Sequence, residues 1–449
     1  MSDKMKAATE LLGEMLYNPR SGLQCIRLTE SKIVQLIEKF YDLSRFWVND
    51  MTDDFMFDGR IIYAHDVSAA VEIQGWIRSE FKLDCSLPSV KQALATVAGR
   101  NRRNPFIEFF ETLVWDRQER LEKFGLNVFG SIEEKHALLW RRYALQMCHQ
   151  VYNRQSAQPK IVPCLRGENN LYKTPFWSAL AMKDEWYTSS IPGDLNRNEE
   201  VERVLEGRLV ACFDEMKHVI KSDQLDAFKN VIGEPKIRYS KKFKDAQNKY
   251  RTCVFGGNTN RDEILKDPTG NSRFYMVDVV NPINVPMVRA LWPQVLAEAK
   301  EHYFRWLEDD EYSYGRPYMT REESDLFEAD RLDAFDFGGD EDKVIDYLNQ
   351  PHIMQEIFEH KCIPSAPMLD AIWGDKGRFN AATLKLIMVT LLGFTKPTRS
   401  IYMPQLRRMS KGYRVTVEDS ALLEWAMSWG NRDVVLVSAE KAGKIKKAN

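Results

Sequence analysis

Apolar residues recur at intervals of three and four in the first third of the chain, a spacing typical of amphipathic helices. A further helix is expected after Ser89, which would cap its first turn. The stretch 105–121 is expected to end near a turn at Trp115 and Asp116. The pattern thus predicts a mainly helical region over residues 1–103 and more helices after it. The helical spacing is found at 7–15, 32–41, 67–81, 105–121 and 134–152.

The middle of the chain changes to short, unbroken apolar runs. Runs of this length suit strands that are buried on both faces of a sheet. Three of them end in polar residues, which would place polar side chains at one edge of such a sheet. We therefore expect an α/β core over residues 104–285. The runs lie at 161–166 and 274–280 and within 204–215 and 250–260.

Helical spacing returns in the last third. A helix is expected at 291–307 with Pro293 in its first turn, and the acidic stretch 308–342 is typical of a linker with a solvated helix. This gives a helix-and-linker segment over 286–342 and a domain over 343–449. The last domain has expected helices at 344–348, 366–373, 381–392 and 403–411 and an alternating strand at 412–417.

Two architectures for the last domain stay open on the pattern alone. Several short helices followed by a terminal hairpin would be winged-helix-like, and a plain helical packing domain is the alternative. In the winged-helix case the candidate phosphate contacts are the cations Arg399, Arg407, Arg408, Lys411 and Arg414.

The segment between the first buried strand and the next helix has the spacing of a phosphate-binding loop. From Gly167 to Lys173 and Thr174 it follows G-x-x-x-x-G-K-[ST], except that Tyr172 occupies the position of the second Gly. Backbone N–H groups and the helix dipole would face the phosphates of ATP. Lys173 would reach the β- and γ-phosphates, and the Thr174 hydroxyl would ligate Mg²⁺. Spacing alone is weak evidence, because such matches arise by chance.

Polar residues at the ends of the other strands fit the same reaction. Asp214 and Glu215 follow an apolar run as in a Walker B strand, where Asp214 would hold Mg²⁺ and Glu215 would orient the attacking water. An ordinary strand ending in an acidic turn is the alternative. Asn260 is a candidate sensor of the γ-phosphate, and Arg273 is a candidate finger for ATP bound by a neighbouring subunit.

A basic stretch with interleaved aromatic residues lies between the second and third strands. Cations contact phosphates and aromatic rings stack on unpaired bases, so a hairpin here would suit a DNA motor. An ordinary basic loop is equally compatible with the pattern. The candidate DNA-binding residues are Lys236, Arg238, Lys241, Lys242 and Lys244, followed by Lys249 and Arg251, with Tyr239, Phe243 and Tyr250 between them.

Composition restricts the alternatives. The chain has 449 residues with 63 Lys and Arg against 65 Asp and Glu, so any DNA-binding surface must be local. Its seven Cys form no C-x-x-C pair, and the His and Cys residues never fall at zinc-ligand spacing. Without a secretory leader or an apolar run of membrane length, we expect a cytoplasmic protein with no membrane partner.

Taken together, the motifs over about 104–280 resemble the virulence-associated E proteins of bacterial mobile elements and prophages, P-loop proteins similar to superfamily 3 helicases. The most specific parts of the match are 256–260 and 265–274. Asn170 within the loop also suits the superfamily 3 form of the motif. Two departures are Tyr172 and Ser272, the latter at a position where family members often carry Arg. Further matching positions are Asn104-Pro105, Trp115-Asp116, the loop 167–174, Leu205-Glu206-Gly207 and Asp214-Glu215.

The resemblance implies an AAA+-like α/β P-loop core and an ATPase with Mg²⁺ as cofactor. Lys173, Asp214, Glu215, Asn260 and Arg273 would be the catalytic residues. It implies a DNA helicase or replication initiator in the bacterial cytoplasm. Such a protein would act as a homo-oligomeric ring, a hexamer, on single-stranded or forked DNA, with phage or host replication proteins as further partners.

Two other functions stay open. Tyr172 in the loop motivates a degenerate P-loop scaffold that binds DNA or a replication protein without ATP turnover. A small-molecule P-loop kinase is the weaker alternative, because the Arg273 turn and the basic stretch have no role in it.

Overall fold

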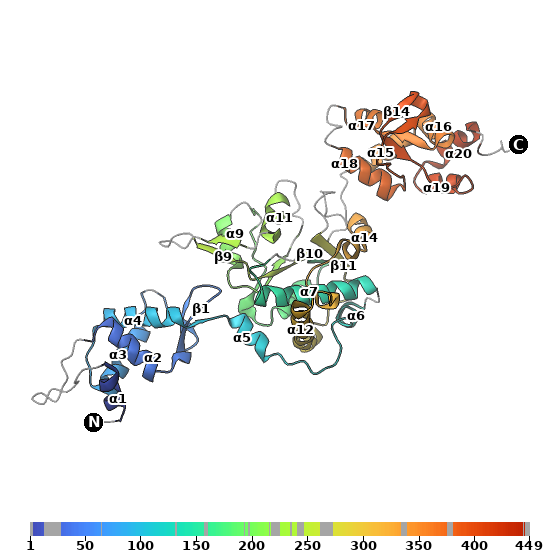
Figure 1. The fold of residues 1–449 in the computed structure, drawn as a ribbon. Coiled ribbons are helices and arrows are strands. Elements are labelled where there is room, and N and C mark those ends of the chain that lie inside the picture. Colours follow the sequence, from blue (N-terminus) through green and yellow to red (C-terminus); the bar gives the residue numbers. More distant parts are fainter. Residues whose placement is uncertain are drawn as a thin grey trace, which may run out of the picture.

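The computed structural model has three lobes in a row, with the two termini at opposite ends (Figure 1). Each lobe has its own apolar core, and the central lobe has two, one on each face of its sheet. The described residues are 3–12, 28–63, 65–130, 133–156, 160–192, 194–195, 198–214, 216, 225–233, 236–239, 247–260, 273–333, 339–374, 380–442 and 444.

The N-terminal lobe packs helices against a small sheet of order β3-β2-β1-β4. The helices agree with the sequence pattern, whereas the sheet was not expected. Ser86, and not Ser89, caps the fourth helix, because the Ser86 hydroxyl accepts from the Ser89 backbone N–H at 3.2 Å. The elements are α1 (Asp3–Leu12), α2 (Glu30–Phe40), β1 (Phe46–Asn49), β2 (Phe55–Phe57), β3 (Arg60–Ile61), α3 (Ser68–Phe81), α4 (Leu87–Arg100) and β4 (Arg102–Arg103).

The central lobe is built on a five-stranded sheet of order β11-β5-β10-β7-β6, in which all neighbours are parallel. Strand β10 therefore lies between β5, which leads into the P-loop segment, and β7, which leads to Asp214. Parallel neighbours end at the same edge, so the polar residues after these three strands meet there. The strands are β5 (Val162–Arg166), β6 (Tyr187–Thr188), β7 (Val210–Phe213), β10 (Val254–Thr259) and β11 (Phe274–Asp278).

Helices cover both faces of this sheet, as buried parallel strands require. Helix α7 agrees with the sequence prediction, while α5 ends at Thr112, three residues before the expected Trp115 turn. The helices are α5 (Pro105–Thr112), α6 (Phe124–Phe129), α7 (Glu134–Tyr152), α8 (Lys173–Leu180), α9 (Asn198–Leu205), α11 (Leu225–Gly233) and α12 (Val285–Glu308).

The expected position of Pro293 in the first turn of a helix is wrong. Helix α12 begins at Val285, where the Asn284 side chain accepts from the Met287 backbone N–H at 3.1 Å, and Pro286 occupies the first turn. Pro293 thus lies inside the helix. Trp292 of α12 is fully buried, donates to the Leu180 carbonyl of α8 and contacts the Phe124 ring of α6, so this helix is part of the central core.

The C-terminal lobe has the order of a winged-helix domain. Helix α16 is followed by β12, by α17 and by α18, which continues as the π-helical turn η6. Thr395 then bridges to Arg414 of β15, and β15 pairs with β12. The elements are α15 (Asp340–Leu348), α16 (Pro351–His360), β12 (Cys362–Pro364), α17 (Ser365–Trp373), α18 (Ala381–Leu386), η6 (Ile387–Leu391), β13 (Ile401–Met403), η7 (Pro404–Leu406), β14 (Arg408–Ser410), β15 (Gly412–Arg414), α19 (Leu422–Met427) and α20 (Arg432–Lys441).

The helix expected at 403–411 is wrong. This segment belongs to a hairpin in which β13 pairs with β14 around the short turn η7. Apolar residues at Met403, Leu406 and Met409 have helical spacing, but Pro404 opens a tight turn and Arg407 takes a left-handed conformation with φ 50°. The segment between the central and C-terminal lobes includes α13 (Arg321–Asp325) and α14 (Glu328–Asp333). Among the described helices, none is long and apolar enough to cross a membrane.

Candidate nucleotide site

The loop between β5 and α8 has one position that only Gly fits and two residues in the left-handed conformation. A side chain at Gly167 would place its Cβ 2.4 Å from the Val279 carbonyl oxygen, so only Gly fits there. Asn170 and Tyr172 are left-handed, with φ values of 66° and 60°. Tyr172 therefore keeps the backbone conformation that Gly usually supplies at this position, at a cost of roughly 1–2 kcal/mol.

The Tyr172 ring does not fill the space beside the loop. Its side chain is 55 % exposed, and the loop borders a cavity of about 530 Å³. A space of this size is within the range of small-molecule sites. Its walls come from the loop, the start of α8 and the ends of β7 and β10. The lining residues are Asn169, Asn170, Leu171, Tyr172, Lys173, Thr174, Pro175, Asp214, Met216, Asn258, Thr259 and Asn260.

Lys173 is the first residue of α8 and is only 9 % exposed. Its Nζ donates to the backbone carbonyls of Gly167 and Glu168, the second at 2.8 Å. Burial lowers the pKa of Lys173, and the charge of Asp214 opposes that shift. Carbonyl dipoles neutralise an ammonium group less than an anion does, so a phosphate at this place would stabilise the charged lysine.

Thr174 and Asp214 meet directly beneath the cavity. The Thr174 hydroxyl donates to Asp214 Oδ1 at 2.5 Å. Asn258 joins them, because its Nδ2 donates to Asp214 Oδ1 at 2.8 Å and to Thr174 Oγ1 at 3.1 Å. The strand order of the sheet brings the three residues together from α8, β7 and β10, as the motif spacing predicted for Thr174 and Asp214.

Asn258 is the residue that the sequence prediction missed. It is 2 % exposed, and its Oδ1 accepts from Trp177 Nε1 at 2.9 Å. The Trp177 ring lies against Gly256, where a Cβ would come within 2.4 Å of it. The Gly256-Gly257 pair directly before Asn258 marked this strand as closely packed, and that signal could have pointed to Asn258.

Thr174 and Asp214 fit a magnesium ion. Both supply hard oxygen ligands, and Mg²⁺ is usually held by one or two protein oxygens together with phosphates and water. Within the described ranges, no three His, Cys, Asp or Glu side chains gather into a metal site. A cation here would therefore depend on bound phosphates and water for its other ligands.

Asn260 and Glu215 are the other residues that the sequence predicted at this edge of the sheet. Asn260 follows β10, is exposed and lines the cavity at its rim. Glu215, next to Asp214, lies outside the described residues.

The basic stretch forms the expected hairpin at least in its two strands, β8 (Lys236–Tyr239) and β9 (Gln247–Tyr250), which pair antiparallel. Lys236 and Arg238 lie on β8. Lys241, Lys242 and Lys244 lie between the strands, outside the described residues. Arg251 is different from the others of this stretch: it is 2 % exposed, donates to the Ile232 carbonyl at 3.0 Å and lies over the Phe255 ring, so it is a core residue.

Arg273 lies at the opposite edge of the sheet from the P-loop. It precedes Phe274, which pairs with Val162 at the start of β5, whereas the loop follows the end of β5. Five strand residues separate the two edges by roughly 16 Å. Arg273 therefore does not reach the cavity beside Lys173 of its own chain.

Arg273 borders a second cavity of about 580 Å³. Its Nη1 is buried and has no hydrogen-bond partner among the described residues, and burial lowers the pKa of its guanidinium group. Lys160, Arg321 and Arg331 also line this cavity, against one carboxylate, Asp325. The space is therefore electropositive and suited to an anion.

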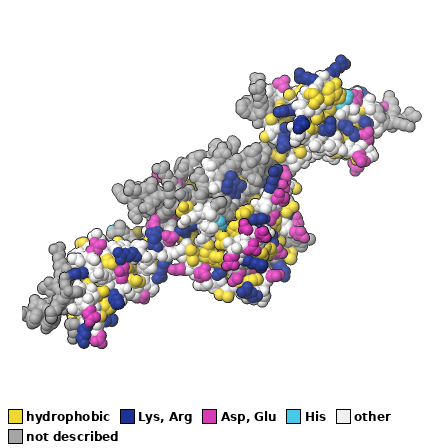
Figure 2. Space-filling view, viewed as in Figure 1, with side chains coloured by type: hydrophobic (Ala, Val, Ile, Leu, Met, Phe, Trp, Pro, Cys, Tyr) yellow, Lys and Arg dark blue, Asp and Glu magenta, His cyan; other side chains and the backbone are white. Residues whose placement is uncertain are grey.

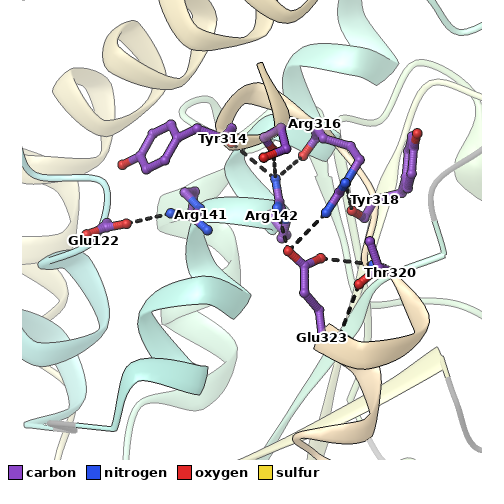
Figure 3. Close-up of polar contacts among 9 residues, drawn as sticks. Glu122, Arg141, Arg142, Tyr314, Arg316, Tyr318, Thr320 and Glu323 are labelled. Carbon is purple, nitrogen blue, oxygen red and sulfur yellow. Dashed lines mark hydrogen bonds and ion pairs between the residues drawn. The ribbon is translucent and has the colours of Figure 1, made fainter. Parts of the chain in front are cut away.

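A cluster of polar contacts around the buried Arg142 includes Tyr318 and Thr320, which line this second cavity (Figure 3). Arg142 of α7 is 2 % exposed and donates to the carbonyls of Ser313, Tyr314 and Arg316 at 2.9, 3.1 and 2.7 Å. It also pairs with Glu323 of α13 at 2.6 Å. Glu323 in turn accepts from the Thr320 backbone N–H at 2.9 Å, which completes the N-terminal cap of α13. Arg142 thus fixes the segment that faces Arg273.

The sheet order, the loop and the Thr174–Asp214 contact define the chain as an α/β P-loop protein of the AAA+-like kind. Residues 110–332 match the family model of the virulence-associated protein E-like domain. This part of the chain is therefore a virulence-associated protein E-like domain, as the sequence resemblance predicted. No curated protein matches the chain.

Solved structures with a similar course of the chain include the NrS-1 C-terminal region (residues 305–718, apo form). It has 12 % sequence identity and a TM-score of 0.43, and the match covers 82 % of this chain and 95 % of that one. A structure of JCV helicase with a bound acetamide compound has 16 % identity and a TM-score of 0.28, with 60 % and 84 % covered. At TM-scores below 0.5 these likenesses do not bear on function.

Proposed function

We propose that the protein binds and hydrolyses ATP at the cavity beside the loop. The observation that carries this proposal is the meeting of Thr174, Asp214 and Asn258 under an open cavity, with Lys173 at its side. Lys173 would contact the β- and γ-phosphates, and Gly167 and Asn170 would shape the loop around them. Thr174 and Asp214 would hold Mg²⁺, which supplies charge neutralisation at the reacting phosphate when bound.

The neighbouring residues would complete the reaction. Glu215 would orient the attacking water, and Asn260 at the cavity rim would contact the γ-phosphate as a sensor. Asn258 would act as a positioning residue, since its amide holds Asp214 and Thr174 in place. The roles of Asn258 and Asn260 rest on their positions in the site, and that of Glu215 rests on its place after Asp214 in the sequence and on the family resemblance.

Arg273 would act on ATP that is bound by a neighbouring copy. Its distance from its own loop supports this role, because an arginine finger of this kind acts on the site of another copy. The proposal therefore includes a closed ring of copies, a hexamer, in which each site is shared by two subunits.

The activity that suits this arrangement is a DNA helicase or replication initiator of a prophage or mobile element in the bacterial cytoplasm. Hydrolysis would move the β8–β9 hairpin, with Lys236, Arg238, Lys241, Lys242 and Lys244, along single-stranded or forked DNA. Phage or host replication proteins would be further partners.

A second candidate is a P-loop scaffold that binds DNA or a replication protein without turnover. The side chain of Tyr172, at the position where the motif has Gly, favours it, because a Cβ and ring beside the cavity can restrict the approach of phosphates to the loop. Nucleotide titration of wild type and Tyr172→Gly separates the two functions. ATP binding by the Gly variant alone would support the scaffold.

The test of the leading function is ATP hydrolysis with and without single-stranded DNA, on wild type and Lys173→Ala. We expect DNA-stimulated turnover in wild type and loss of at least a hundredfold in the variant. Equal background rates in both proteins would remove the enzymatic function. Lys183→Ala, a change of an exposed lysine outside the cavity, is the matched control and should hydrolyse ATP like wild type.

A further inference from the structure

The C-terminal lobe carries a concentration of positive charge that the proposed ATP site does not use. Residues 380–416 contain seven cations and no Asp or Glu, in a chain whose net charge is −2. All of these cations except the half-buried Lys396 are exposed. They come from α18 and from the segment 396–414, which we name the wing. The seven are Lys385, Lys396, Arg399, Arg407, Arg408, Lys411 and Arg414.

These cations are not neutralised within the described part of the lobe. None of them forms an ion pair with a described carboxylate, whereas Lys361 and Lys444 of the same lobe both pair with Asp419. Burial, followed by the charges of Lys385 and Lys411, lowers the pKa of Lys396. Lys396 is therefore repelled by Lys385 of α18 and by Lys411 of the wing, a cost that a bound polyanion would reduce.

The β13–β14 hairpin of the wing also exposes two large apolar side chains. Tyr402 of β13 and Met409 of β14 are direct partners across the two strands, so they lie on one face. They are 56 % and 61 % exposed, while the next pair brings Met403 into the core. In Figure 2 the C-terminal lobe shows a yellow patch with dark blue side chains around it, where Figure 1 labels β14.

Helix α18, which would enter the major groove in a winged-helix protein, carries less positive charge than the wing. Helix α18 and η6 have one cation, Lys385, and much of their surface is core: Leu384, Ile387 and Met388 are fully buried. Phosphate contacts on this lobe must therefore come mainly from the wing. An exposed apolar pair between cations is the arrangement by which proteins enter a minor groove and unstack a base step.

We propose that the wing is a double-stranded DNA site, separate from the proposed single-strand path of the ATPase core. Arg407, Arg408 and Lys411 contact phosphates, and Tyr402 with Met409 rests in the minor groove. This site needs no nucleotide, and its existence does not depend on ATP turnover.

The test uses the full chain and a fluorescein-labelled 30-base-pair duplex, without nucleotide, over a range of salt concentrations. Arg407→Ala with Arg408→Ala should weaken duplex binding about tenfold and reduce the slope of log affinity against log salt by about two. Tyr402→Ala with Met409→Ala should weaken binding several-fold and leave the slope unchanged. Arg432→Ala with Lys441→Ala removes two exposed cations from α20 of the same lobe and should bind like wild type.

Three results would overturn the proposal. Wild-type protein could fail to bind the duplex, the α20 control could lose as much affinity as the wing variant, or the wing variant could lose single-strand and duplex binding equally. Circular dichroism and thermal melting of each variant separate a lost contact from a lost fold. ATPase activity measured in parallel distinguishes this site from the core, since the wing variants should keep the wild-type rate without DNA.

Discussion

Tyr172 shows how a single residue can depart from a motif and still preserve its backbone. The left-handed conformation is required by the path of the loop, and Tyr adopts it at a cost that Gly avoids. Because the ring is more than half exposed, its removal loses little buried area. The cost of the left-handed conformation at Tyr172 should therefore be measurable in the free energy of unfolding.

We predict that Tyr172→Gly unfolds with a free energy about 1 kcal/mol higher than Tyr172→Ala, because both remove the ring and only Gly relieves the strained φ. Chemical denaturation of the two variants measures this difference directly. Equal stability of the Gly and Ala variants would mean that the loop has no such strain.

Asn258 is the second position where a residue-scale prediction follows. Asn258→Ala should lower the free energy of unfolding by about 1–3 kcal/mol, because it leaves the buried Trp177 Nε1 without an acceptor. It should also reduce ATP turnover, since Thr174 and Asp214 lose their common donor. Asn260→Ala, at an exposed position, is the comparison and should change stability by less than about 0.5 kcal/mol. Equal destabilisation by Asn258→Ala and Asn260→Ala would contradict the claim that the hydrogen bonds of Asn258 stabilise the site.

At the scale of elements, the sequence predicted the helices with long apolar stripes and the buried strands. Helix α7 and strand β11 are examples, because periodicity and unbroken apolar runs report burial directly. Gly167, Lys173, Thr174 and Asp214 were predicted from spacing, since the loop and the strand ends are local features.

Long-range contacts were not predictable in this way. The side chain of Asn258 is directed by Trp177, 81 positions away, and Arg251 was grouped with solvent-facing cations although it packs in the core. The hairpin at 401–410 was missed because its apolar spacing also suits a helix.

Arg142 gives the element-scale prediction, because one side chain joins α7 to α13 and the segment before it. Arg142→Met should lower the free energy of unfolding by about 3 kcal/mol or more, since it removes the side-chain donor of three carbonyls and one of the two arginines that bind the Glu323 carboxylate. The neighbouring Arg141, which pairs with the exposed Glu122 at 2.5 Å, supplies the control, and Arg141→Met should cost clearly less. Equal losses would mean that the cluster in Figure 3 does not hold the segment.

The same cluster predicts a pH dependence. Burial opposes ionisation of Glu323, but its hydrogen bonds to Arg142 and Thr320 and the charges of Arg142 and Arg316 lower its pKa overall. A carboxyl whose pKa is lower in the folded state stabilises the fold above its unfolded pKa of about 4.3, and this contribution is lost as pH falls through the folded value. The stability gap between wild type and Glu323→Gln should thus be full at pH 7 and close below pH 4. A gap that is constant from pH 7 to pH 3 would contradict this sign.

At the scale of the whole molecule, the proposed ATP site draws on residues from two opposite edges of the central sheet. Lys173 lies at the loop edge, and Arg273, whose buried Nη1 has no hydrogen-bond partner among the described residues, lies at the far edge. One copy cannot bring the two together across roughly 16 Å of strand. Two copies can, if the far edge of one faces the loop edge of the next in a head-to-tail ring.

The most direct measurement of this claim is the ATPase rate of mixtures of Lys173→Ala and Arg273→Ala, combined before assembly. Each variant alone should be inactive, because every shared site lacks one of its two parts. An equal mixture should recover roughly a quarter of the wild-type rate, since a Lys173→Ala subunit still offers Arg273 to the intact loop of an Arg273→Ala neighbour. A mixture as inactive as its components, alongside an active wild type, would contradict the shared site.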